Sequence, residues 1–194
     1  MESTKIASAG PASFAGISLV LFLMFVSLIG LVTPAAALPI GIFAIAVGAI
    51  NLIGAVFDHL NGESAGNIGV VFGVLFFVTG AGVWNVVQYF AGLRGWPLDP
   101  TIIGWVYLWL GAILLLWAPV LFRAPYTLSL PVALLGVMVV VMGAVQLGWM
   151  PASLMTAVAY GFLVNAILYL YSAVAILINT TYQRAVLPLP APRS

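Results

Sequence analysis

The run SFAGISLVLFLMFVSLIGLV, from Ser13 to Val32, contains no charged side chain. A helix of about 20 apolar residues is long enough to cross the hydrocarbon core of a bilayer. Ala35-Ala36-Ala37 after this run has the small residues of a signal-peptidase site, but the apolar core of a signal peptide has only about 7–15 residues. We therefore interpret the run as a retained transmembrane helix.

Five further apolar runs of similar length follow the first. With it, they extend from Ser13 to Val32, Ala37 to Phe57, Asn67 to Phe90, Thr101 to Phe122, Leu128 to Trp149, and Ser153 to Ile178. Proline and glycine in the gaps between the runs disfavour continuation of a helix. The sequence predicts an all-α membrane protein in which a six-helix transmembrane domain, residues 13–178, lies between an N-terminal tail, residues 1–12, and a C-terminal tail, residues 179–194.

The composition agrees with a membrane protein. Hydrophobic residues make up 64% of the chain and charged residues 5%, whereas soluble domains have about 45–50% apolar and about 25% charged residues. A charge at the bilayer centre costs roughly 2.5–3.5 kcal/mol on insertion scales. The titratable side chains lie in or beside the gaps between apolar runs; they are Glu2, Lys5, Asp58, His59, Glu63, Arg94, Asp99, Arg123, Arg184 and Arg193.

The basic residues predict the orientation of the bundle. Six spans place both termini on one side of the membrane, and that side collects Lys5, Arg123, Arg184 and Arg193, whereas the other side has only Arg94. Lysine and arginine are enriched in cytoplasmic segments. We therefore expect a multi-pass protein of the cytoplasmic cell membrane with both termini in the cytoplasm.

Several classes of function are excluded by the residues that are absent. There is no cysteine and only one histidine, His59, so no thiolate chemistry, His-cluster metal centre or Ser-His pairing inside the spans can be built. The only lysine, Lys5, lies in the N-terminal tail, and no Gly-rich phosphate loop is present. We expect no enzyme activity, no metal, no cofactor and no nucleic-acid partner.

Polar side chains inside the spans are few and uncharged. Those that we single out are Asn51, Tyr107, Gln146, Asn165 and Tyr171. Each is explained either by a hydrogen bond between helices or by a pathway that offers hydrogen bonds to a small polar solute. Asp58 and His59 at the end of the second span form either an exposed interfacial pair or a pair that senses pH.

Two segments carry a resemblance to a known family. The C-terminal run NTTYQRAVLPL, from Asn179 to Leu189, resembles the N-E-x-[YF]-G-R-T-V-L-P-[LI] ending of the acetate uptake transporter (succinate–acetate permease) family. In the second span, NLIGAVFD from Asn51 to Asp58 is similar to the family's Q-[IL]-x-A-G-x-x-E. The matching positions include Asp58, Asn179, Arg184 and Pro188, together with Pro11, which corresponds to the first proline of the family's N-P-A-P-[LF]-G segment.

The resemblance implies a fold and a function. It implies a ring-shaped homo-oligomer, typically a hexamer, with a pore through each six-helix protomer, and it maps the family's pore constriction to Leu19, Phe72 and Leu135. The implied function is a channel or transporter in the lipid bilayer for acetate or a related small monocarboxylate, driven by the solute gradient alone or with a cotransported proton. An apolar constriction suits a small weak acid and excludes hydrated ions.

The sequence leaves two alternatives open. The first is a channel for urea or a short amide, which would use the same uncharged lining. The second is an accessory or structural membrane protein without permeation, which a bundle centre filled by side chains would support.

Overall fold

The computed structural model describes residues 9–63, 66–119 and 126–189, and within these ranges the chain forms helices and turns but no strand. The elements are α1 (Gly10–Leu28), the short 3₁₀ turn η1 (Pro34–Ala36), α2 (Ala37–Leu60), α3 (Gly66–Val71), the π-helical segment η2 (Phe72–Val83), α4 (Trp84–Arg94), α5 (Thr101–Trp117), α6 (Tyr126–Gln146) and α7 (Leu154–Tyr182). α3, η2 and α4 follow one another without a break and form one long helix, residues 66–94.

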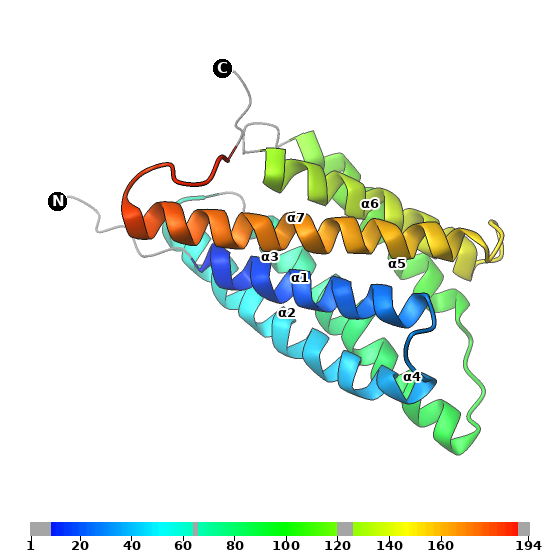
Figure 1. Cartoon of the computed structure of the whole chain (residues 1–194). Coiled ribbons are helices and arrows are strands. Elements are labelled where there is room, and N and C mark those ends of the chain that lie inside the picture. The colour runs from blue at the N-terminus through cyan, green and yellow to red at the C-terminus, as the bar shows by residue number, and fades with distance from the viewer. Residues whose placement is uncertain (1–8, 64–65, 120–125, 190–194) are drawn as a thin grey trace.

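Six spans surround one centre. α1 packs most extensively on α7, α2 on the helix of residues 66–94, and α5 on α6. The ring is completed by contacts of α1 with α2, of α6 with α7, and by the weakest seam, between α5 and η2. α1 begins and α7 ends at the same end of the bundle, whereas α4 ends and α5 begins at the opposite end (Figure 1).

Proline and glycine mark the boundaries of these helices. Pro11 and Pro34 lie in the first turn of α1 and of η1, where a missing backbone N–H leaves no intrahelical bond unmade. Gly30, Gly62 and Gly95 follow the ends of α1, α2 and α4 with φ values of 76°, 77° and 65°. A positive φ at this position is favourable for glycine and closes a helix end.

Glycine also allows two pairs of helices to approach closely. A Cβ atom built on Gly48 of α2 would lie 2.7 Å from the carbonyl oxygen of Gly73 in η2, and one built on Gly111 of α5 would lie 2.9 Å from that of Gly136 in α6. No side chain fits at such distances. Small residues thus let the backbones touch, which is how helices associate where lipid is as apolar as the side chains.

The prediction of an all-helical, multi-pass membrane protein is confirmed by the structure. Five helices are long and apolar enough to span a membrane, and the helix of Thr101–Trp117 is apolar but shorter. The fourth predicted span extends to Phe122, which lies outside the described residues; α5 is described from Thr101 to Trp117. α1 begins earlier than predicted, at Gly10, and α7 continues to Tyr182.

Some of the predictions concern residues outside the described part of the chain. Lys5, Arg123 and Arg193 lie outside it, as do most of the N-terminal tail and the last five residues. Of the basic residues used for the orientation, Arg94 and Arg184 are described. Arg94 ends α4, and Arg184 follows α7, so they lie at opposite ends of the bundle (Figure 1).

Candidate functional site

One cavity opens at the end of the bundle where α1 begins and α7 ends. This terminal-end cavity has a volume of about 280 Å³. Its lining is mostly apolar, with Asn51 and Tyr169 on its walls and Phe72 beside them. Two carboxylates, Asp58 and Glu63, also line it. The cavity is therefore a vestibule with polar contacts and an acidic side, and no Lys, Arg or His is among its lining residues.

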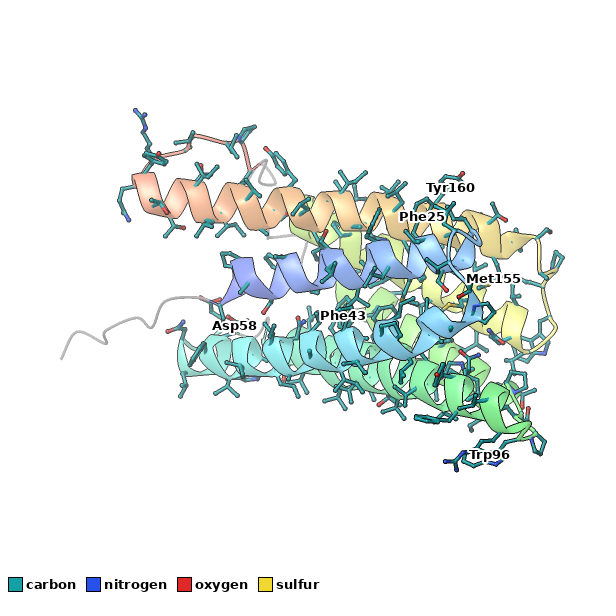
Figure 2. The ribbon with its side chains drawn as sticks, turned by 60° about the horizontal axis from the view of Figure 1, so that its bottom comes forward. Phe25, Phe43, Asp58, Trp96, Met155 and Tyr160 are labelled. Carbon is teal, nitrogen blue, oxygen red and sulfur yellow. The ribbon has the colours of Figure 1, made fainter. Side chains whose placement is uncertain are left out.

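The second cavity lies toward the opposite end and is smaller, about 160 Å³. Asn85, Gln88 and Gln146 give this distal cavity its polar surface, and Tyr107 and Met155 also line it. Figure 2 shows Asp58, at the terminal-end cavity, and Met155, at the distal cavity, near opposite ends of the bundle. The two cavities thus approach the centre of the ring from its two ends.

Between the cavities the centre is closed by side chains. The largest fully buried side chains come from five of the six spans; they include Leu21, Phe76, Phe77, Leu110, Leu135, Val139, Phe162, Asn165 and Tyr169. Aromatic rings dominate this closed core, with Phe76 in contact with Phe77 at 5.0 Å and with Phe162 at 6.4 Å between ring centroids. The two cavities are separate, and these fully buried side chains form the core of the bundle.

The π-helical segment η2 brings three phenylalanines into this core. Thr79 Oγ1 donates to the Val74 carbonyl five residues earlier, at 2.9 Å, which fits the wider turn of a π-helix. The wider turn lets Phe72, Phe76 and Phe77 share one face, where all three are buried. Sequence reasoning missed this segment; π-helical turns are often found at functional sites, but nothing in the local sequence distinguishes them from an α-helix.

The structure separates the three residues of the predicted constriction. Phe72 is buried at the inner part of the terminal-end cavity, and Leu135 is fully buried in the closed core. Leu19 instead lies on the outer surface of α1 with 47% of its surface exposed, whereas Val20 and Leu21 are buried. Because successive helical residues point in different directions, a shift of one or two positions in an alignment moves the residue to another face. Leu19 therefore lines neither of the two cavities.

The predicted polar residues fall into three places. Asn51 lines the terminal-end cavity, and Tyr107 and Gln146 line the distal cavity. Tyr107 donates a hydrogen bond to the Gly80 carbonyl, at 3.0 Å, so it crosses the seam between α5 and η2. Asn165 lies inside the closed core, fully buried.

Tyr171 and four positions of the C-terminal run form a separate contact. The side chain of Asn179 donates to the Leu187 carbonyl at 2.8 Å and accepts from the Val186 and Leu187 amides at 2.8 and 2.9 Å. Tyr171 Oη donates to the Pro188 carbonyl at 2.6 Å. This tail clamp folds the segment after α7 back onto the helix, and it places Tyr171 outside both cavities.

Arg184 and Pro11 have simpler positions. Arg184 is exposed, and its amide bonds to the Asn179 carbonyl at 3.3 Å in the turn after α7. Pro11 is in the first turn of α1. The resemblance of the C-terminal run therefore corresponds to a structural turn, with the Asn179 side chain at its centre.

Asp58 and His59 are adjacent in the chain but have different surroundings in this structure. Asp58 is directed to the terminal-end cavity, whereas His59 Nδ1 contacts the Ala55 carbonyl at 2.6 Å and its Nε2 contacts Asn67 Oδ1 at 3.3 Å. His59 thus joins α2 to α3. In the described ranges no three His, Asp or Glu side chains come together as ligands for a metal.

Comparisons with known proteins agree with the fold. No protein-family model and no curated protein matches the sequence. The structure matches that of the bacterial acetate channel SatP with a TM-score of 0.81 and 18% identity, over 95% of this chain and 99% of that chain. The two proteins share one fold. At this identity the match with SatP concerns the architecture alone.

Proposed function

We propose that this chain is a membrane channel for a small monocarboxylate, with acetate as the first candidate solute. The observation that carries the proposal is the pair of cavities that enter the six-span ring from its two ends and stop at one closed core. The fold that it shares with an acetate channel supports the same conclusion. So does the resemblance of its C-terminal and second-span segments to the acetate uptake transporter family.

The closed core suits this function because it is apolar and narrow. Rings from η2 and α7 close it, and an apolar constriction blocks hydrated ions until it opens. A gradient of the solute, with or without a cotransported proton, then drives the flow. We further propose a homo-oligomer, typically a hexamer, with cytoplasmic termini in the cell membrane; the resemblance supports the assembly, and the basic residues support the orientation.

Two other functions are considered beside the monocarboxylate channel, an amide channel and an accessory protein without permeation. A urea or short-amide channel would use the same amide side chains in the two cavities. An accessory protein without permeation is favoured by one observation, the core filled by side chains. The cavities on both sides of that core favour a channel seen in its closed conformation.

The experiment is a flux assay with purified protein in sealed vesicles. Uptake of labelled acetate and of labelled urea is compared with uptake into vesicles of the same lipid without protein. We expect protein-dependent acetate flux. Selective urea flux would replace the proposal by the amide channel, and the absence of flux for every small solute would leave the accessory function.

A further inference from the structure

Three asparagines inside the spans make the same local hydrogen bond. In each, Nδ2 donates to the backbone carbonyl four residues earlier: Asn51 to Val47 at 2.9 Å, Asn85 to Ala81 at 2.6 Å, and Asn165 to Gly161 at 3.2 Å. A carbonyl only accepts, so the nitrogen of each amide must face the helix backbone and the oxygen must point elsewhere. One such amide lies in the terminal-end cavity, one in the distal cavity and one in the closed core.

The amide in the closed core is the exceptional one. Asn165 Oδ1 is buried and has no hydrogen-bond partner, the only such side-chain atom in the described part of the chain. An unpaired buried acceptor is costly. An apolar side chain of similar size would avoid that cost at this position. An acceptor without a partner in the resting structure is therefore available for a donor that arrives during function.

Its place in the bundle matches a point on the route of a solute. Asn165 lies on the inward face of α7, one turn from Phe162 on one side and one turn from Tyr169 on the other. Tyr169 lines the terminal-end cavity, and the Phe162 ring packs against Phe76 in the closed core. The free oxygen thus stands where the terminal-end cavity ends and the barrier begins.

We propose that Asn165 Oδ1 is the hydrogen-bond acceptor for the solute at the closed core, and that the species that passes it is the undissociated acid. This inference rests on the proposed function, because it names the form in which the monocarboxylate crosses. An undissociated acid supplies an O–H for Oδ1, and its carbonyl oxygen can accept the second N–H of the same amide. A carboxylate has only acceptors, so it would leave Oδ1 unpaired and bring a charge into the apolar core.

The charges around the pathway favour the same species. The titratable groups that line the cavities are Asp58, Glu63 and Tyr169 at the terminal end and Tyr107 at the distal end. No lysine, arginine or histidine lines either cavity, so the described lining offers no cation to compensate an anion. Two carboxylates at the vestibule would repel an anion rather than attract it.

The ionisation state is tested with wild-type protein in vesicles at fixed total acid. Acetate is measured together with glycolate, whose neutral form crosses bare lipid more slowly, and the flux of protein-free vesicles is subtracted. If the undissociated acid passes, protein-dependent flux falls about tenfold for each pH unit above the pKa of the acid. Because the undissociated acid carries no charge, the protein-dependent flux should also be unchanged when a membrane potential is imposed. Flux that follows total acid and responds to the potential would overturn the inference.

The role of Asn165 is tested by substitution. Asn165→Leu keeps the volume but removes the acceptor, and we expect protein-dependent flux to fall about tenfold, the effect of one lost hydrogen bond. The matched control is Thr181→Val, which removes an exposed hydroxyl on the same helix that donates to the Leu177 carbonyl at 2.8 Å; its flux should equal that of the wild type.

A second pair of variants covers the case in which the leucine variant does not fold. Asn165→Ser and Asn165→Ala leave side chains of similar size that differ in one oxygen. We expect the serine variant to keep more flux than the alanine variant, and equal fluxes would overturn the role of the acceptor. The outcomes also distinguish the proposed function from the present inference. If the wild type shows no flux of any monocarboxylate, the proposed function is wrong. If it passes the anion, only the present inference is wrong.

Discussion

Substitution of Phe72 tests whether the closed core is the barrier to flow. The Phe72 ring lies 6.4 Å from that of Phe76 and 6.2 Å from that of Phe77, and the side chain is buried beside the terminal-end cavity. Phe72→Ala removes both ring pairs and opens the inner part of the cavity toward the core.

The size of the effect depends on how much of the packing of Phe72 is lost when the core opens. Phe72, Phe76 and Phe77 all belong to η2, so their ring pairs persist when helices move apart, whereas burial of a phenylalanine side chain in a core is worth about 3–5 kcal/mol relative to alanine. If the open state lacks about 1–3 kcal/mol of that packing, removal of the ring raises the population of the open state about 5-fold to 150-fold. We expect acetate flux to increase within this range and larger monocarboxylates to become permeant.

The assay is the vesicle flux measurement, with Phe43→Ala as a matched control. Phe43 is half exposed on the outer face of α2 (Figure 2), so its loss removes a ring without touching the core. Folded Phe72→Ala protein with the flux and size selectivity of the wild type would refute the view that these rings close the pathway. Leu135→Ala provides an independent test from α6, because Leu135 is fully buried in the same core.

Three further changes test the packing of the bundle. Gly48→Ala places a Cβ 2.7 Å from the Gly73 carbonyl, so we expect a loss of about 1–3 kcal/mol in stability, measured as earlier thermal unfolding in detergent. Asn179→Ala removes the hydrogen bonds of the tail clamp, and trypsin should then cut after Arg184 faster than in the wild type; an unchanged rate would contradict the clamp. Tyr107→Phe removes the bond from α5 to η2, which should lower stability by about 0.5–1.5 kcal/mol and raise flux, whereas reduced flux would show that the hydroxyl serves the solute.

The spans could be read from the sequence because lipid imposes a simple rule on the chain. A long apolar run must form a helix to satisfy its own backbone, and residues such as Pro34, Gly62 and Gly95 mark the ends of the runs. The ring of six spans could not be read in the same way. Which helices touch depends on glycine positions that face one another, such as Gly48 and Gly73, and one sequence does not show which faces pair.

The candidate site was predicted in part. Asn51, Tyr107 and Gln146 line the cavities because amides and hydroxyls in a span are kept away from lipid. Leu19 and Tyr171 were misplaced for two different reasons. The position of Leu19 depends on which face of α1 it occupies, and that of Tyr171 depends on how the segment after α7 folds back onto the helix. Composition shows neither feature. The unpaired oxygen of Asn165 is also a property of the folded bundle, since it depends on which groups fail to reach it.

The uneven contacts around the ring bear on how the core would open. α1 with α7, α2 with the helix of residues 66–94, and α5 with α6 form three tightly joined pairs, whereas η2 and α5 touch least. Each pair of helices would therefore move as a rigid unit. The centre of the bundle would widen when these units move apart. The hydrogen bond from Tyr107 to Gly80 connects α5 and η2, the neighbouring helices with the weakest contact. This single hydroxyl therefore holds together the interface that would separate most easily.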